Sequence, residues 1–365
     1  MIERIDQFLK NSPVVSSLYR NNTARIKRET CLLLHRAGLL KPYTFVMWLA
    51  TYGCNFQCSY CEASAGTPAE NELTTEEALA MVDDIAAMGV KRFAVSGGEP
   101  LIRSDILPIM SRAHAAGLNL GLISNGYLVE ELWEKLRQFD YFLFFTSIDG
   151  LPEYNDRVRR EGSFARVMKS LELFSSKQVG TRMINTVIHS ENIHQLNELH
   201  GLLKDSGATS WRLVPIMDVG RAENKQSFAL TGAQLRELAE FIKEHTTRKF
   251  TVDFGEACTY LGCLLPEPVG NPFFCGAGLT RCTIMPDGEV LGCQTIYDNR
   301  FSEGNIRKKP FSRIWKEEFS RFRQSKKFPG YCSDCGYFNA CQGGCWSEME
   351  KKGECLKKTW ETGSG

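Results

Sequence analysis

Three cysteines crowd into one short segment, and their type and spacing are suited to holding a metal. The segment is YGCNFQCSYCEAS, residues 52–64, and contains Cys54, Cys58 and Cys61. Structural zinc sites close with four protein ligands, so three thiolates on one loop would leave a zinc site incomplete. A 4Fe–4S cluster held by three thiolates keeps one iron open. We therefore expect a cluster whose open iron is chelated by the amino and carboxylate groups of an amino-acid-like cofactor.

A second group of cysteines lies near the carboxyl end, in the runs CGAGLTRCTIMPDGEVLGC and CSDCGYFNACQGGCWSEMEKKGEC. Its eight thiolates suffice for two fully ligated 4Fe–4S clusters: Cys275, Cys282, Cys293, Cys332, Cys335, Cys341, Cys345 and Cys355. A pair of zinc knuckles remains the alternative, because C-x2-C is also a zinc signature. Either kind of metal can also be purely architectural, since ligation stabilises loop-rich regions with little core.

The other metal-type residues form no such pattern. Fourteen cysteines is a high count for an intracellular chain, and a reducing compartment favours metal over a disulfide framework. Cys31, in the apolar stretch CLLLHRAGLL, is expected to be a small buried hydrophobe. Cys258 and Cys263 are expected to be buried, with a redox or substrate-contacting role as the alternative. The six histidines show no metal spacing, so His189 and His194 are expected to be loop and cap residues.

Alternating strands and helices must position these cysteines. Continuously apolar runs predict buried strands within residues 45–51, 92–100, 119–126, 141–150, 181–188 and 210–217. Helical periodicity predicts helices at 74–89, 105–116, 129–138, 164–175 and 193–204. Thr74 and Glu77 have capping-box spacing at the first helix, and Gly89 stands at its usual stop. Apolar strands joined by helices predict an α/β fold with a parallel sheet, closed or partly closed into a barrel.

Polar loops follow the predicted strands, where parallel sheets gather their chemistry. The strand ends are YGCNFQC, SGGEP, SNG, SIDG and PIMDVGR. Each alone can be an ordinary turn, because turns favour Gly, Ser, Asn and Asp. Because the first of these loops carries three cysteines, we expect all of them to lie together at the carboxyl end of the predicted barrel.

The Cys-x3-Cys-x2-Cys loop, with an aromatic before its third cysteine and SGGEP after the second strand, resembles the radical S-adenosylmethionine (SAM) superfamily. The resemblance implies a partial (β/α)6 TIM-like barrel over roughly residues 45–220, with a SAM-binding cluster on Cys54, Cys58 and Cys61. It also implies SAM contacts at Tyr60, Gly97, Gly98, Glu99, Pro100, Ser124, Asn125, Ser147, Asp149 and Arg159. The SGGEP residues would contact the methionyl amino group of SAM. Arg159, or its neighbour Arg157, would contact the carboxylate of SAM.

The second cysteine group is similar to the SPASM domain, the auxiliary-cluster extension of that superfamily. The resemblance implies one cluster on Cys275, Cys282, Cys293 and Cys345, and another on Cys332, Cys335, Cys341 and Cys355. Full ligation favours electron relay or scaffolding over substrate binding at an open iron. We expect four regions: a helical arm (1–44), the barrel (45–220), a helical and strand bridge (221–270) and a small, loop-rich iron–sulfur domain (271–360).

The resemblance implies an enzyme that reductively cleaves SAM to a 5′-deoxyadenosyl radical and abstracts a substrate hydrogen atom. SPASM proteins mostly modify peptides, so the first hypothesis is an oxidoreductase that crosslinks, epimerises or oxidises a ribosomally synthesised peptide. The alternative is a small-molecule dehydrogenase or decarboxylase acting on a sugar, aminoglycoside, nucleoside or tetrapyrrole. A non-enzymatic electron carrier would leave SGGEP without a purpose. The sequence identifies no catalytic residue beyond the cofactor ligands.

Two local features bear on the substrate. Sulfatase-maturating relatives carry an aspartate base after the cysteine that matches Cys293, whereas this chain has Gln294, so formylglycine formation is not expected. About 43 residues precede the first predicted strand, too few for the precursor-binding winged-helix module of many peptide maturases. Residues 1–44 carry eight Lys or Arg against three acids. Such a basic amphipathic arm can hold an acidic leader peptide, an anionic small molecule or a membrane surface, or pack on the barrel.

Overall composition limits the partners. The 44 basic and 43 acidic residues nearly cancel, so the chain has no field that attracts nucleic acid. No apolar run reaches the roughly 18 residues of a membrane-spanning helix. The opening lacks a signal-peptide pattern, which predicts a cytoplasmic location. The expected partners are a precursor peptide or small-molecule substrate and an electron donor such as flavodoxin or ferredoxin.

Overall fold

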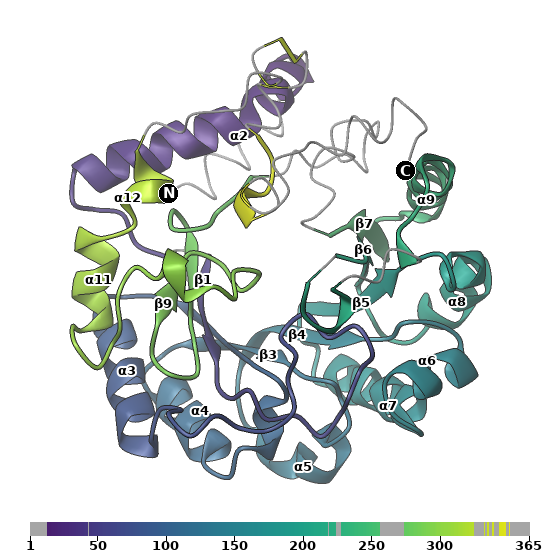
Figure 1. Cartoon of the computed structure of the whole chain (residues 1–365), viewed down its shortest axis with the longest axis horizontal. Coiled ribbons are helices and arrows are strands. Elements are labelled where there is room, and N and C mark those ends of the chain that lie inside the picture. Colours follow the sequence, from purple (N-terminus) through teal and green to yellow (C-terminus); the bar gives the residue numbers. More distant parts are fainter. Residues whose placement is uncertain are drawn as a thin grey trace.

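One curved sheet of nine strands organises the described part of the chain (Figure 1). The computed structural model describes residues 13–42, 44–217, 219–223, 228–255 and 274–324, and residues 332, 334–335, 338, 343–347 and 350, with side chains from residue 25 onward. Cys258, Cys263, Cys341 and Cys355, and the predicted arm before residue 13, lie outside these ranges.

The predicted partial barrel is confirmed, and its sheet is open. The strand order is β7-β6-β5-β4-β3-β2-β1-β8-β9, and all neighbours are parallel except β8 and β9. The structure adds a parallel strand to each side of the six that the sequence predicted. The strands are β1 (Phe45–Leu49), β2 (Arg92–Ser96), β3 (Asn119–Ile123), β4 (Tyr141–Ser147), β5 (Thr181–Ile188), β6 (Ser210–Pro215), β7 (Thr251–Phe254), β8 (Arg281–Ile284) and β9 (Val290–Leu291).

Helices cover the outer face of this sheet (Figure 1). They are α3 (Thr75–Ala87), α4 (Ile106–Ala115), α5 (Val129–Leu136), α6 (Pro152–Val158), α7 (Ser163–Ser176), α8 (Leu196–Leu203) and α9 (Gly232–His245), with 3-10 turns η1 (Pro100–Ile102), η2 (Ile193–Gln195) and η3 (Gly220–Ala222). The predicted capping box of α3 is present, because the Thr74 hydroxyl accepts from Glu77 N and Glu77 Oε2 accepts from Thr74 N. Gly89 follows with φ +72°, where a residue with a side chain would be strained.

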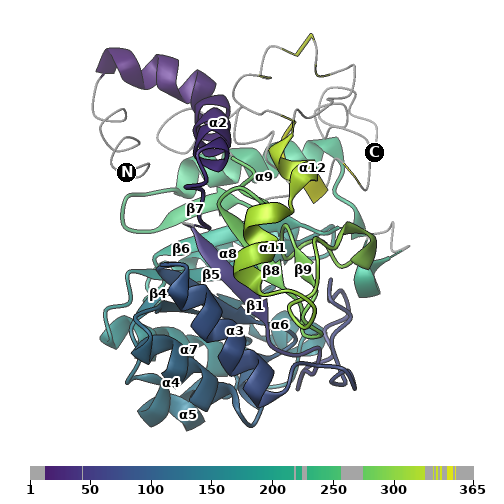
Figure 2. The same ribbon diagram turned by 90° about the vertical axis from the view of Figure 1, so that its left-hand side faces the viewer.

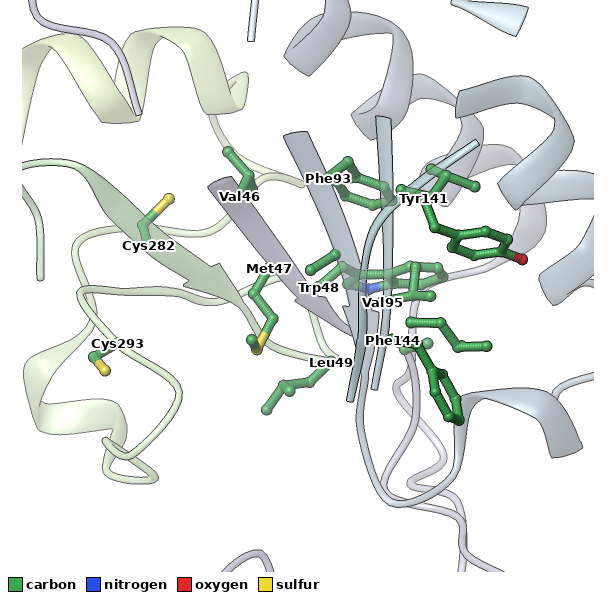
Figure 3. Close-up of a cluster of buried hydrophobic side chains, with 14 of the residues drawn as sticks. Val46, Met47, Trp48, Leu49, Phe93, Val95, Tyr141, Phe144, Cys282 and Cys293 are labelled. Carbon is green, nitrogen blue, oxygen red and sulfur yellow. The ribbon is translucent and has the colours of Figure 1, made fainter. Parts of the chain in front are cut away.

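Alternation along the inner strands separates a helix-facing layer from the barrel interior. In Figure 3 the side chain of Trp48 lies on the opposite side of β1 from Met47 and Leu49. Trp48 is fully buried, and the guanidinium of Arg103 lies 5.2 Å from its ring centroid. Phe93 of β2 is fully buried as well, so the helix-facing layer forms a continuous core. Burying side chains of this size contributes roughly 1.5–3 kcal/mol each, which holds the strand ends in register.

The carboxyl-terminal region is attached to the barrel by a strand. In β8, Cys282 lies in register with Val46 of β1 (Figure 3). Beyond it come η6 (Asn299–Phe301), α11 (Phe311–Glu317) and α12 (Ser320–Arg323). The guanidinium of Arg307 forms an ion pair with Glu77 at 2.7 Å, so this region also contacts α3. The second cysteine group is therefore fixed to the same sheet as the first.

An amino-terminal helix, α2 (Pro13–Arg36), lies beside α12 (Figures 1 and 2). Arg28 Nη2 donates to the carbonyls of Phe322 and Gln324 at 3.1 and 2.9 Å. Cys31 is fully buried, which confirms the prediction of a small buried hydrophobe. The described part of the basic arm thus contacts the carboxyl-terminal region through Arg28. Within the described ranges, no helix is both long and apolar enough to span a bilayer.

Candidate active site

The three predicted cluster cysteines lie on the loop that leaves β1, and the base of this loop is closed by backbone hydrogen bonds. Gly53 and Gly66 form a parallel bridge, Cys54 N donates to Gly66 O at 2.8 Å, and Gly66 N donates to Tyr52 O at 2.9 Å. Glu72 Oε1 accepts from the backbone N of Tyr52 at 2.7 Å and from Ala69 N at 3.0 Å. The sequence analysis did not identify Glu72, whose carboxylate fixes the base of the cysteine loop through these hydrogen bonds.

The thiols of this loop are partly buried. Burial raises the pKa of the Cys54 thiol to about 11, although the hydrogen bond that Phe56 N donates to its sulfur lowers the pKa. Burial also raises the pKa of Cys58, which the charge of Arg159 opposes. Ligation must therefore release protons from these thiols. Among the described residues, no three Cys, His, Asp or Glu side chains are gathered tightly enough for a single metal ion. A cubane cluster is larger than one ion and joins thiolates that lie further apart.

The SGGEP loop lies directly against the base of the cysteine loop. Gly98 N donates to Thr51 O, and Glu99 N donates to Gly53 O, both at 2.8 Å. Gly97 has φ +140°, and a Cβ added there would lie 2.5 Å from Thr51 O. A Cβ at Gly98 would overlap the Gly53 carbonyl oxygen. Both glycines are therefore required by close backbone approach, and Pro100 then begins η1.

Replacing Gly98 by alanine is expected to lower the free energy of unfolding by about 2 kcal/mol, because the new methyl group forces two backbones apart. The matched control is Gly201→Ala in α8, where a Cβ would meet nothing within 4 Å. That change is expected to stabilise by up to about 1 kcal/mol, since alanine favours a helix. Denaturant unfolding of the metal-free proteins measures both. Equal stability of Gly98→Ala and the unaltered chain would contradict the close approach.

Glu99 is the buried centre of the predicted SAM-binding residues. Its carboxyl is fully buried and accepts hydrogen bonds from Leu101 N at 3.0 Å, Asn125 N at 2.7 Å and Ser124 Oγ at 3.0 Å. Burial raises its pKa to about 7, and these hydrogen bonds oppose the shift. Asn125 Nδ2 in turn donates to Asn55 Oδ1 at 2.7 Å. The loops after β2 and β3 therefore meet at the Glu99 carboxyl, and the loop after β1 is joined to them through Asn55.

A buried ion pair joins the loop after β4 to the same region. Arg159 Nη1 lies 2.5 Å from Asp149 Oδ2, and Val187 N donates to Asp149 Oδ1 at 2.8 Å. Asp149 is fully buried. The buried Nε of Arg159 has no hydrogen-bond partner among the described residues. Arg157 instead lies 4.9 Å from the ring centroid of Tyr154. Of the two candidate arginines, Arg159 is the one turned toward the cysteine loop.

An aromatic cluster lines the other side of Tyr60. The Tyr60 ring is buried, and its centroid lies 5.6 Å from that of His189. The His189 ring lies 4.8 Å from that of Phe228, tilted by 44°, and its Nε2 lies 3.0 Å from the Tyr154 hydroxyl. Ser147 ends β4, in register with Asn185. The sequence analysis placed His189 in a loop but gave no sign of its full burial beside Tyr60, because this contact joins distant strand ends.

The described members of the second cysteine group are mostly buried. Cys282, Cys293, Cys332 and Cys345 are at most 8% exposed, and Cys275 and Cys335 are half-buried. Burial raises the pKa of the Tyr297 hydroxyl, and the charges of Glu62, Cys61 and Cys293 raise it further. The charges of one cysteine from each group thus act on the same phenol.

A cavity of about 460 Å³ lies inside the open barrel and connects the two groups. Its walls come from alternate residues of the strands, including Met47, Phe145, Met183 and Val214. Residues of both cysteine regions also border it, with Tyr60 and Glu62 from one and Gln294, Thr295 and Cys345 from the other, and the strands add polar groups that include Arg92, Arg212 and Arg281. A side chain or small molecule inside this cavity would contact both regions.

The residues present fit a 4Fe–4S cluster with an amino-acid-like cofactor. Three thiols lie on one loop, and two glycines keep the neighbouring backbone free of side chains. The buried Nε of Arg159 offers a charged donor that no described group satisfies, which suits a carboxylate. Glu99 offers a carboxyl that suits an ammonium group.

Comparison with known proteins agrees with this chemistry. Residues 48–203 match the model of the radical SAM superfamily, and residues 275–336 match SPASM, an iron–sulfur cluster-binding domain. The mycofactocin maturase MftC of Mycolicibacterium smegmatis is 32% identical over 82% of this chain and 76% of its own length. An AdoMet-dependent heme synthase of Methanosarcina barkeri is 28% identical over 82% of this chain and 90% of its own length.

Solved structures share the fold. Streptococcus suis SuiB bound to its precursor peptide SuiA superposes with a TM-score of 0.70 at 17% identity, covering 89% of this chain and 76% of SuiB. The protein anSMEcpe, with bound AdoMet and the Cp18Cys peptide, superposes with a TM-score of 0.67 at 20% identity, covering 87% of this chain and 95% of that protein.

Proposed function

The chain belongs to the radical SAM superfamily, with a SPASM domain, and from that premise we propose that it modifies a ribosomally synthesised peptide. It is an enzyme whose cofactors are SAM and 4Fe–4S clusters. When bound, these cofactors supply one-electron reductive cleavage of SAM to a 5′-deoxyadenosyl radical that abstracts a hydrogen atom. The observation that carries the proposal is the cavity bounded by both cysteine groups.

The chain's own residues would bind, orient and shield the reactants. We propose that Cys54, Cys58 and Cys61 hold the SAM-binding cluster. The SAM contacts are proposed at Tyr60, Gly97, Gly98, Glu99, Pro100, Ser124, Asn125, Ser147, Asp149 and Arg159. Among them, the Glu99 carboxyl would accept from the methionyl ammonium, and Arg159 would donate from Nε to the carboxylate. The apolar walls of the cavity would exclude water from the reacting carbon.

The second cysteine group would hold two auxiliary clusters. One would use Cys275, Cys282, Cys293 and Cys345, and the other would use Cys332, Cys335, Cys341 and Cys355. Cys345 lines the cavity, and the charges of Cys293 and Cys61 both raise the pKa of the Tyr297 hydroxyl. The first of these clusters would therefore border the substrate. We propose electron relay as its role, with flavodoxin or ferredoxin as the external donor.

Two observations support a peptide as the substrate. The relative with 32% identity is named as a maturase, and SuiB has been solved with its precursor peptide. The cavity has the size of sites that enclose small ligands, so a few side chains of an extended peptide fill it. A tetrapyrrole remains the second candidate, because heme synthases are also among the relatives.

The deciding experiment co-expresses this protein with a short peptide encoded beside its gene and measures the peptide's mass. A modified peptide, formed only with SAM and a reductant, is the expected result. An unchanged peptide, together with conversion of an iron coproporphyrin by the same preparation, would favour the second candidate. Failure to cleave SAM with either substrate would overturn radical chemistry altogether.

SAM binding is expected to strengthen as pH rises through 7. Only ionised Glu99 can pair with the methionyl ammonium, and burial raises the pKa of this carboxyl to about 7. Below that pH, affinity is expected to fall about tenfold per pH unit. Equilibrium dialysis of labelled SAM at pH 6, 7 and 8 measures the effect under anaerobic conditions.

The Glu99→Gln variant is expected to bind SAM weakly and without this pH dependence. Glu172→Gln is the matched control, because Glu172 is exposed and pairs with Lys169 on the surface of α7. This control should keep the pH profile of the unaltered protein. A profile that is flat between pH 6 and 8 in the unaltered protein would refute the role given to Glu99.

A further inference from the structure

The segment that follows β6 forms hydrogen bonds with the cysteine loop through Arg221. Arg221 Nη1 donates to the Cys58 carbonyl at 2.8 Å, and its Nη2 donates to the Ala65 carbonyl. The backbone N of Arg221 donates to the Cys61 carbonyl at 3.0 Å. One residue therefore contacts three carbonyls of the loop, two of which belong to proposed cluster ligands.

Gly220 lets this segment come so close. Its φ is +59°, a conformation that L residues rarely adopt. A Cβ there would overlap the carbonyl oxygens of both Cys61 and Glu62. The Gly220–Arg221 backbone is thus pressed against the loop, while the Arg221 side chain spans it.

The other ties of the loop lie elsewhere, and one of them is the hydrogen bond from Asn125 Nδ2 to Asn55 Oδ1 at 2.7 Å. Its base is closed by the bridge between Gly53 and Gly66. Arg160 Nη1 donates to Asn55 O at 2.8 Å, but this contact is exposed. Ser59 N donates to Val158 O at 3.3 Å. Through its guanidinium, Arg221 joins the middle of the loop at Cys58 to its end at Ala65.

The same segment forms part of the cavity wall. Ile216, Met217 and Val219 line the cavity, and Gly220 and Arg221 come next along the chain. The contact to the cysteine loop therefore begins where the proposed substrate would lie.

We propose that Arg221 is a positioning residue, which fixes the backbone of the three-cysteine loop in the geometry that holds its cluster. The proposal rests on the cluster assigned above to Cys54, Cys58 and Cys61. A guanidinium presents several N–H donors in a rigid plane, so it can serve two separate carbonyls at once. A lysine keeps the charge but donates from one nitrogen, so it cannot span the loop in this way.

The first arm of the test uses the full-length protein as isolated and reads hydrogen exchange of residues 54–66. Arg221→Lys and Arg221→Gln are expected to exchange faster than the unaltered chain in this loop and equally elsewhere. Arg300→Lys is the matched control, because Arg300 is an exposed surface residue paired with Asp298. Unchanged exchange in both Arg221 variants would overturn the proposal.

The second arm uses anaerobically reconstituted protein. In Arg221→Lys, iron of the SAM-binding cluster is expected to be lost to a chelator about tenfold faster or more, as for other residues that orient metal ligands. The electron paramagnetic resonance signal that SAM shifts should weaken in parallel, while far-ultraviolet circular dichroism stays unchanged. Cluster retention and signal equal to those of the unaltered protein would show that charge alone suffices and would refute the spanning role.

The two arms separate this proposal from the proposed function. If the unaltered protein took up no cluster on the cysteine loop, the proposed function would fail, and hydrogen exchange would still decide whether Arg221 orders the loop. If the unaltered protein holds the cluster and the Arg221 variants hold it equally well, only the positioning role is lost.

Discussion

Replacing Cys58 by alanine is expected to abolish release of 5′-deoxyadenosine from SAM. The loop after β1 carries Cys54, Cys58 and Cys61, and with one thiolate removed it leaves the cluster with two protein ligands. Three cubane clusters correspond to about twelve irons per chain, so the variant is expected to hold about four fewer. Anaerobic incubation with SAM and a strong reductant, followed by chromatography, measures the nucleoside.

The matched control for this variant is Cys31→Ala. Cys31 is fully buried in α2 and is not one of the proposed ligands, so its replacement should leave the iron content and 5′-deoxyadenosine release unchanged. Full release of 5′-deoxyadenosine by Cys58→Ala would remove the basis for radical chemistry at this loop. About four irons in the unaltered protein, together with bound zinc, would instead overturn the assignment of the second cysteine group.

Replacing Arg159 by methionine is expected to lower the free energy of unfolding by about 3–5 kcal/mol, because it leaves a buried charge uncompensated. Asp149 is fully buried, and Arg159 pairs with it at 2.5 Å. The variant is also expected to bind SAM poorly, since it lacks the donor proposed for the carboxylate. Guanidinium chloride unfolding of the metal-free protein and equilibrium dialysis measure the two effects.

Two comparisons make this prediction specific. Arg112→Met breaks an ion pair with Asp83 whose side chains are 55% and 47% exposed, and should cost far less stability because solvent screens the pair. The double variant Asp149→Asn with Arg159→Met should recover part of the lost stability, because it removes both charges. Equal losses from Arg159→Met and Arg112→Met would show that the buried pair contributes no more than a surface pair.

Most of the barrel could be predicted because β1 and β2 are buried on both faces and carry continuous apolar runs, while β5 alternates buried and partly exposed residues along its length. β7 was missed as a strand of the sheet, since Thr251–Phe254 is short and lies at its edge. The pairing of β8 with β1 could not be predicted either. The residues of β8, RCTI, show no strand pattern of their own, and a register between distant segments leaves no local signal.

The candidate site shows the same division. Residue types and spacing predicted the cysteines, and the shared strand ends predicted that SGGEP, SNG and SIDG would gather near them. Glu72 and His189 were missed, because their contacts depend on how separate loops pack. Arg221 lies within PIMDVGR, which the sequence indicated only as a polar loop at a strand end. Its three acceptors become visible only in the folded chain.

The pairing of β1 with β8 also matters while the protein is being made. Phe45–Leu49 and Arg281–Ile284 lie 236 positions apart (281 minus 45), so the ribosome completes most of the polypeptide before β1 gains its second neighbour. Until then the nascent chain exposes an apolar strand edge, which is prone to pair with other chains. Shortened versions that end before β8 would therefore aggregate, and the segment carrying the second cysteine group serves as the cover that ends this exposure.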